Sequence, residues 1–134
     1  MPAWPTMASQ ADVRRIALSL PETSEDGGEG RVSFSVQNRD KQKAFVWTWM
    51  ERVEPRKPRV PRPDVVAVRV LNQLEKEVLL ASGADRLFTE PHYSGFPAVL
   101  VRLPAIEVEE LRELIVNAWL RQAPRTLVQR FGGT

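Results

Sequence analysis

The sequence predicts an α+β fold: a two-layer sandwich in which helices cover one face of an antiparallel sheet of about five strands. Three observations lead to this fold class. Apolar residues recur at helical spacing in three segments, and five short segments show the alternation or the apolar run of a strand. Hairpin-like turns join neighbouring strands, which favours antiparallel pairing. The expected order of elements is α-β-β-β-α-β-β-α, with the second face of the sheet open to solvent.

The chain of 134 residues is expected to form one domain over residues 8–131, after a disordered extension over residues 1–7. Its 43% of hydrophobic and 27% of charged residues are typical of a globular protein. The sequence has no cysteine, which excludes disulfides, thiolate zinc sites and cysteine nucleophiles. The N-terminus is unlike a secretory signal, and no apolar run approaches the ~20 residues of a membrane span. These features predict a cytoplasmic protein that does not associate with membranes.

The first expected element is a helix from Ser9 to about Leu20. Ser9 and Asp12 have the spacing of a capping box, and Pro21 ends the helix. Residues 22–30 are acidic and rich in glycine, which predicts a loop.

The middle of the chain is expected to form three strands. Alternation of apolar and polar residues predicts a strand over residues 32–36, and a turn at 38–40 leads into a second strand over about 43–50. A loop over residues 52–63 follows, in which four prolines favour an extended conformation. The third strand is expected over residues 65–70.

A short helix is expected over residues 73–81, with Leu74, Val78 and Ala81 on one side and Gly83 as its C-terminal stop. The remaining predicted elements are a strand over 87–90, a turn over 92–97, a strand over 98–103, a helix over 107–121 with an acidic first turn, and a last turn over 126–131.

One segment of the chain is strongly basic. Nine basic and three acidic residues lie between Arg31 and Pro63, a net charge of +6, whereas the rest of the chain carries −4. The segment also contains Phe45, Trp47 and Trp49. Basic groups beside aromatic rings suit a polyanion with stackable bases. The residues predicted to contact nucleic acid are Lys41, Lys43, Trp47, Trp49, Arg52, Arg56, Lys57, Arg59 and Arg62.

Alternatives to this interpretation remain open at the sequence level. The basic loop can also be a solvated connector. Strict alternation puts Phe45, Trp47 and Trp49 on one face of their strand, and that face either packs beneath the helices or is the open one. Val46 and Met50 make the opposite face apolar as well, so strand phase does not decide between these alternatives.

Two further arginines are expected on the outward face of the sheet. Arg69 and Arg102 alternate with the valine stripes of their strands. The open alternatives are plain solvation and a role in extending a basic surface across the sheet.

Catalytic and metal-binding patterns are missing from the sequence. His92 is the only histidine, and it has no cysteine or spaced carboxylate pair to complete a metal site. The sequence has no glycine motif that cradles phosphates and no plausible serine–histidine–acid arrangement. We therefore expect a binding protein without a cofactor or catalytic residues.

Several segments resemble the MmcQ/YjbR family. The resemblance covers about residues 8–131 and is most specific in one hairpin and in the last helix. The matching segments are Phe88 to Leu103 for the hairpin, Glu109 to Leu111, Ala118 to Trp119 and Gln122 to Pro124 for the last helix and its exit, and Phe45 to Trp49 and Asp64 to Val70 for the central strands.

The resemblance implies a two-layer fold of the predicted order, related in shape to type III secretion chaperones. It also implies DNA binding, with the sheet and its loops acting as wings. The long loop over residues 52–63 departs from shorter family members, which have a tight turn there. The alternative function is a chaperone-like module that holds a peptide on the open sheet face or a strand edge. DNA and a protein are thus the two expected partners, and the expected state is a monomer or a weak dimer.

Overall fold

The computed structural model describes residues 7–28 and 30–132. The helices are α1 (Gln10–Leu18), α2 (Gln73–Ser82), α3 (Val108–Gln122) and α4 (Arg125–Gly132), with short 3-10 helices η1 (Pro91–Tyr93) and η2 (Leu103–Ala105). The strands are β1 (Thr23–Gly28), β2 (Arg31–Asn38), β3 (Lys41–Glu51), β4 (Val60–Arg69), β5 (Leu87–Phe88) and β6 (Ala98–Arg102).

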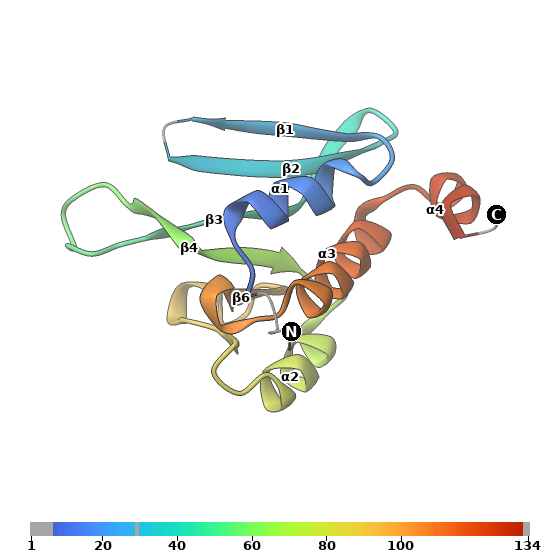
Figure 1. Cartoon of the computed structure of the whole chain (residues 1–134). Helices are drawn as coiled ribbons and strands as arrows, with labels where there is room; N and C mark the ends of the chain where they lie inside the picture. The colour runs from blue at the N-terminus through green and yellow to red at the C-terminus, as the bar shows by residue number, and fades with distance from the viewer. Residues whose placement is uncertain (1–6, 29, 133–134) are drawn as a thin grey trace, which may run out of the picture.

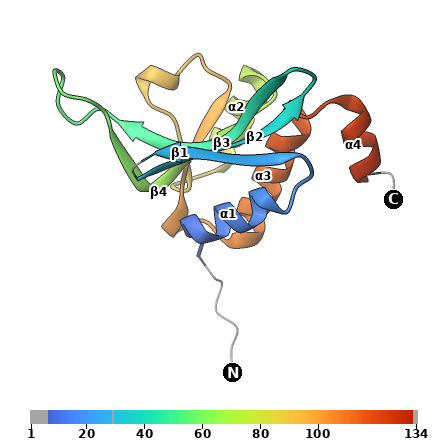
Figure 2. The same ribbon diagram turned by 90° about the horizontal axis from the view of Figure 1, so that it is seen from above.

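The strands form an antiparallel sheet in the order β1-β2-β3-β4-β6-β5. Helices α1 and α3 pack on one face of it (Figure 1, Figure 2). The predicted α+β two-layer sandwich is therefore confirmed, with six strands in the described part of the chain instead of about five. Of the predicted extension over residues 1–7, Met7 lies within the described residues and forms an isolated bridge with Glu107, whereas residues 1–6 lie outside them.

The start of α1 follows the sequence prediction. The Asp12 carboxylate accepts hydrogen bonds from the Ser9 backbone N–H (3.0 Å) and the Ser9 hydroxyl (3.1 Å). The Arg15 side chain, which donates to Asp12 at 2.9 Å, is the main cause that lowers the pKa of this carboxyl. The capping box thus sets where α1 begins, and the apolar spacing of Val13 and Ile16 places one face of the helix in the core.

The predicted loop over residues 22–30 is wrong, because Thr23–Gly28 forms the edge strand β1. These residues pair with β2 from Thr23 opposite Val36 to Gly28 opposite Arg31. The strand has no apolar alternation because both of its faces are largely solvated, so pairing with β2 defines it. Gly27 is required there, since a Cβ at this position would lie 2.4 Å from the carbonyl oxygen of Arg31.

The predicted loop over residues 52–63 is wrong in its second half, where residues 60–63 already belong to β4. Pro61 pairs opposite Met50, and the register shifts between Thr48 and Trp49. A proline has no N–H to donate, and strands accommodate it at such irregularities. The shortened connection, residues 52–59, projects from the sheet (Figure 1).

The main core lies between the sheet and the helices. The strands contribute fully buried side chains such as Phe34, Val46 and Val99, and α3 contributes Ile115 and Trp119. The indole N–H of Trp119 donates to the carbonyl oxygen of Pro21 at 3.0 Å. The last predicted helix is confirmed as α3, and the predicted last turn is the helix α4, which extends away from the sheet (Figure 2).

Candidate nucleic-acid interface

A bulge in β3 decides which face of the sheet carries Trp47. Ser35 pairs with Ala44 and Phe34 pairs with Val46, so Phe45 is an extra residue in β3. Phe45 and Val46 are consequently both 0% exposed in the main core. Trp47 falls on the opposite, open face, and the prediction that Phe45 shares a face with the tryptophans is wrong.

A row of paired residues crosses the open face through Trp47. It runs through all six strands, from β1 to β5, as Asp26, Ser33, Trp47, Ala67, Leu100 and Phe88. Ala67 and Leu100 are buried with Val65 in a small second cluster, on which Trp47, Trp49, Phe88 and Tyr93 pack. The tryptophans are thus half-buried and lie outside the main core, which favours the open-face alternative.

The aromatic rings on this face contact one another edge to face. Trp47 and Phe96 have ring centroids 6.2 Å apart at an interplanar angle of 72°, and Trp49 and Phe88 lie 5.7 Å apart at 79°. The indole N–H of Trp47 also donates to the Tyr93 hydroxyl at 3.3 Å. The rings therefore form two groups, Trp47 with Tyr93 and Phe96, and Trp49 with Phe88.

Arg69 and Arg102 lie on this same face, so their predicted outward orientation is confirmed. Arg69 pairs with Ala98 on β6, and its guanidinium lies 5.2 Å from the centroid of the Phe96 ring. The Arg102 guanidinium lies 3.9 Å from the centroid of the Phe88 ring. We call the set of Trp47, Trp49, Phe88, Tyr93, Phe96, Arg69 and Arg102 the aromatic–arginine face.

A buried lysine holds part of this face, and the sequence analysis missed it. Lys76 of α2 has no exposed surface, and its Nζ donates to the carbonyl oxygens of Tyr93 and of Phe96, the latter at 2.9 Å. Burial lowers the pKa of Lys76. One signal for this burial was available in the sequence. Lys76 precedes Leu79 and Leu80 by three and four residues, so it shares a helix face with these partly buried leucines.

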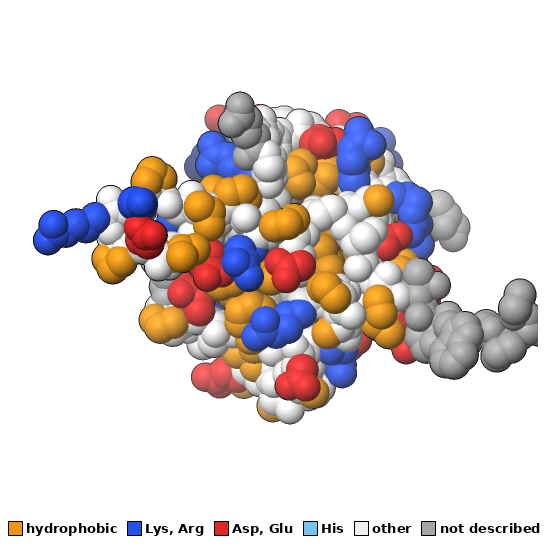
Figure 3. All heavy atoms as spheres, turned by 60° about the vertical axis from the view of Figure 1, so that its left-hand side comes forward, with side chains coloured by type: hydrophobic (Ala, Val, Ile, Leu, Met, Phe, Trp, Pro, Cys, Tyr) orange, Lys and Arg blue, Asp and Glu red, His pale blue; other side chains and the backbone are white. Residues whose placement is uncertain are grey.

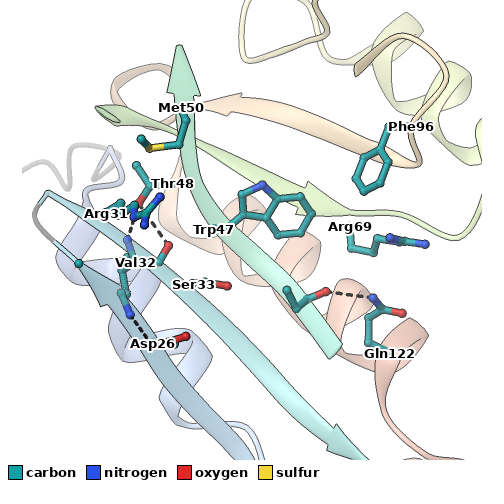
Figure 4. A pocket seen from close by; sticks show the side chains of 13 residues that line it. Asp26, Arg31, Val32, Ser33, Trp47, Thr48, Met50, Arg69, Phe96 and Gln122 are labelled. Carbon is teal, nitrogen blue, oxygen red and sulfur yellow. Dashed lines mark hydrogen bonds between the residues drawn. The ribbon is translucent and has the colours of Figure 1, made fainter. Parts of the chain in front are cut away.

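A groove of about 590 Å³ crosses the open face beside Trp47. Figure 4 shows the Trp47 indole between Arg31 of β2 and Arg69 of β4, with Phe96 beside Arg69. Arg31 and Arg69 are two residues from Ser33 and Ala67 in the row described above, which places both arginines on the face of Trp47. Asp26, Ser33 and Ala44 also line the groove, so it offers an aromatic surface between two cations with polar groups close by.

Most cations of the predicted basic loop are engaged within the loop or with β3. Lys57 pairs with Glu54 at 3.2 Å, and Arg62 pairs with Glu51 at 3.3 Å. The remaining hydrogen bonds run from Arg52 to the carbonyl oxygens of Pro55 and Lys57 and from Arg59 to that of Met50. Among the described residues, Arg56 is the loop cation without an ion pair, a hydrogen bond or a ring contact.

Lys41 and Lys43 lie far from this loop. They begin β3, at the hairpin with β2, whereas the loop over residues 52–59 follows the other end of the same strand. Trp47 lies between the two ends, and Trp49 lines a separate hollow with Arg52 and Arg59. On the face that Figure 3 shows, basic, acidic and hydrophobic side chains of the described residues are interspersed. The structure therefore divides the predicted basic segment into two separate groups.

Comparison with known proteins places the chain among relatives. No family model matches it. The uncharacterized proteins Mb2600 of Mycobacterium bovis and MT2646 and Rv2570 of Mycobacterium tuberculosis are each 41% identical over 132 residues, covering 93% of this chain and 96% of the relative. The chain belongs to the family of these mycobacterial proteins. The solved structure of Deinococcus radiodurans protein DR2400, which has a DUF419 domain, aligns with a TM-score of 0.60 over 98% of this chain and 86% of that chain. At 21% identity this match shows a shared fold.

The described residues show neither a metal-ligand cluster nor a membrane-spanning helix. Residues 7–28 and 30–132 contain no group of three or more His, Cys, Asp or Glu residues that could hold a metal ion. In the same ranges, no helix has the length and apolar character needed to cross a membrane. The side chain of His92 lies outside the described part of the structure.

Proposed function

We propose that this protein binds single-stranded nucleic acid on the open face of its sheet. The observation that carries the proposal is the position of Trp47, whose indole lines a groove between Arg31 and Arg69. Every nucleobase can stack on an aromatic ring, so this contact does not depend on the nucleotide sequence. Neighbouring arginines can bind the phosphates on either side of the stacked base. Asp26 and Ser33 offer hydrogen-bonding groups to the base edge in the same groove.

This proposal changes the role of the predicted loop. Lys57 and Arg62 are paired with acids, so the loop supplies little free charge for phosphate contacts. Binding then depends more on stacking and on the two groove arginines. We expect a log–log salt slope of about −1.4 to −2, corresponding to two or three phosphate contacts on a single strand.

The experiment is a fluorescence-anisotropy titration of the full chain with a labelled single-stranded oligonucleotide at two salt concentrations. Trp47→Ala should weaken binding by about 5- to 150-fold, the range found when a stacking ring is removed. Trp49→Ala is the matched control, because Trp49 lies on the same face but does not line the groove. Equal weakening by both substitutions, or no binding of the wild type at low salt, would contradict the proposal.

The family shared with the mycobacterial relatives can be assigned to a more specific named family. We propose that the chain is an MmcQ/YjbR protein, and that its DNA-binding role follows the description of that family. The confirmed hairpin region around β6 and the confirmed helix α3 support this assignment, since they carry the matching residues. The fold shared with the DUF419 domain of DR2400 supports it as well. The cysteine-free sequence and the lack of a catalytic motif support a cytoplasmic binding protein without enzymatic activity.

A second candidate function is a protein-interaction module, and one observation on α2 favours it. The predicted apolar side of this helix, Leu74, Val78 and Ala81, faces solvent: Leu74 is 68% and Val78 is 60% exposed, while Lys76 is buried instead. Leu71, just before the helix, is 56% exposed. Exposed aliphatic stripes of this kind mark interaction surfaces. The edge strand β1 is a poorer docking site, because the charges of Glu25 and Asp26 disfavour strand addition.

The two candidates are separable by substitution. Leu74→Glu with Val78→Glu should abolish binding of a protein partner and leave oligonucleotide affinity at the wild-type value. Trp47→Ala should do the opposite. Loss of oligonucleotide binding in the Leu74→Glu, Val78→Glu variant would show that the groove is not the nucleic-acid site.

A further inference from the structure

A second hollow, of about 630 Å³, lies between the tip of the β2–β3 hairpin and the corner where α3 passes into α4. Its walls come from residues 38–43 and residues 123–126, which are distant in the sequence. The charged residues that line it are Arg39, Lys41, Lys43 and Arg125, which are cationic, and Asp40, which is acidic. The hollow therefore has a net charge of +3.

The walls of this hollow are fixed to each other. The Asn38 side-chain amide donates to the carbonyl oxygen of Gln122 at 2.8 Å, and the Gln122 amide donates to that of Ala44 at 2.9 Å. These two bonds tie the hairpin to the last turn of α3. The backbone segments that carry Lys41, Lys43 and Arg125 are thus held close to each other, and ligand binding needs to order only the side chains.

Within residues 7–28 and 30–132, the cations of this hollow have no ion pair, hydrogen bond or ring contact. Most Lys and Arg side chains of the described residues are engaged in ion pairs, hydrogen bonds or ring contacts. Within that part of the chain, the cationic side chains without any of these contacts are Arg31, Arg39, Lys41, Lys43, Arg56, Arg125 and Arg130. Four of these seven line the one hollow. Like charges brought together repel one another, and a bound anion would relieve that repulsion.

We propose that this hollow is a phosphate-binding site. Two lysine ammonium groups and two arginine guanidinium groups supply point charges and planar forks, the combination that recognises phosphate. The Thr126 hydroxyl is a further donor in the same lining. A net charge of +3 suits a ligand with at least two negative charges. The bound phosphates belong either to a free phosphate compound or to a nucleic-acid strand. Phosphate binding in this hollow does not depend on the proposed nucleic-acid binding in the groove at Trp47.

The test is an NMR titration of the isotope-labelled full chain at low salt, with pyrophosphate in one arm and a single-stranded oligonucleotide in the other. Amide signals of residues 39–43, Ala123, Arg125 and Thr126 should shift; Pro124 has no amide proton. Shifts with pyrophosphate identify a free phosphate ligand, and shifts only with the oligonucleotide identify the nucleic-acid backbone as the source. No shift of these signals in either arm would overturn the proposal.

A pair of charge-matched variants separates this site from general electrostatics. Lys43→Glu with Arg125→Glu should weaken binding by at least about tenfold, because it removes two charge-assisted hydrogen bonds. Arg56→Glu with Arg130→Glu changes the net charge equally but alters arginines outside the hollow, and it should keep wild-type affinity. Equal weakening by both variants would refute a specific site. Lys43→Gln with Arg125→Gln repeats the test should the double glutamate variant fail to fold.

The outcome is distinguishable from failure of the proposed nucleic-acid groove. Trp47→Ala should leave the shifts of residues 39–43 with pyrophosphate unchanged. Loss of pyrophosphate binding in Trp47→Ala would mean that the hollow is not an independent site, and would contradict the proposal.

Discussion

Lys76 Nζ donates a 2.9 Å hydrogen bond to the carbonyl oxygen of Phe96, although Lys76 has no exposed surface. The same nitrogen donates to the carbonyl oxygen of Tyr93. The Tyr93 hydroxyl in turn accepts a hydrogen bond from the Trp47 indole N–H, and the Phe96 ring contacts the Trp47 ring edge to face. One buried amine therefore positions the turn that borders the candidate nucleic-acid interface.

This arrangement predicts how stability changes with pH. Burial lowers the pKa of Lys76 from its ordinary value of 10.5, so the unfolded chain binds more protons than the folded chain between the lowered pKa and 10.5. The contribution of Lys76 to the free energy of unfolding should therefore rise as pH increases through this window. The measurement is urea unfolding of the wild type and of Lys76→Met at several alkaline pH values.

Subtracting the two unfolding free energies cancels the other titrating groups, because Lys76→Met lacks only this one. The difference, wild type minus variant, should increase with pH. A difference that stays constant or falls would show that Lys76 is not held in a desolvated site.

The bulge in β3 predicts opposite roles for two neighbouring aromatic residues. Phe45→Ala should destabilise the fold by about 3–5 kcal/mol, the cost of emptying a phenylalanine site in a core. Trp47→Ala should cost less, because Trp47 is half-buried on the open face. Denaturant unfolding of both variants measures this order, and the reverse order would contradict the assigned register.

Close packing between β1 and β2 predicts a difference between two glycines. Gly27→Ala should destabilise the protein by more than about 1 kcal/mol, because its Cβ would lie 2.4 Å from the Arg31 carbonyl oxygen and distort the strand pair. Gly95→Ala is the control, since nothing lies within 4 Å of a Cβ there. It should be neutral or stabilising by about 0.4–1 kcal/mol. Similar melting temperatures for both variants would argue against β1 as a paired strand.

The start of α1 should lose stability in acid. The pKa of Asp12 is lowered, chiefly by the Arg15 side chain, so its contribution is present above the ordinary value of 3.8 and is lost as pH falls through the lowered pKa. At neutral pH, Asp12→Asn should cost about 0.3–1 kcal/mol, as for a carboxylate in the first turn of a helix. Wild type and variant should converge at low pH. A difference in the free energy of unfolding that persists below the lowered pKa would exclude the carboxylate charge as its source.

The sequence predicted the elements whose residues follow a regular pattern. The helices α1 and α3 and the central strands have apolar residues at the expected spacing, and they were predicted with nearly their observed bounds. Strand β1 was missed because both of its faces are solvated, so its identity depends on partners in β2 rather than on its own residues. The start of β4 was missed because its prolines indicate a loop when read alone.

The candidate site was predicted less completely than the fold. The residue types were informative: Trp47 and Trp49 lie on the open face together with Arg69 and Arg102. The closeness of the basic residues in the sequence was not informative, because the length of β3 separates Lys41 and Lys43 from the loop. An extended strand rises about 3.3 Å per residue, so residues a few positions apart along it lie far apart in space. The burial of Lys76 also depends on acceptors in a distant turn, which helical periodicity does not report.

The extra residue at Phe45 makes the function of the open face depend on the backbone of β3 as well as on its composition. If β3 kept all of its residues but alternated strictly from Ala44, without the bulge, Val46 would turn to the open face and Trp47 would enter the main core. Deleting Phe45 would remove the bulge and leave Trp47 opposite Ser33 on the open face. Relatives that bind the same ligand should therefore either keep the bulge or lack one residue between the β2–β3 turn and the tryptophan.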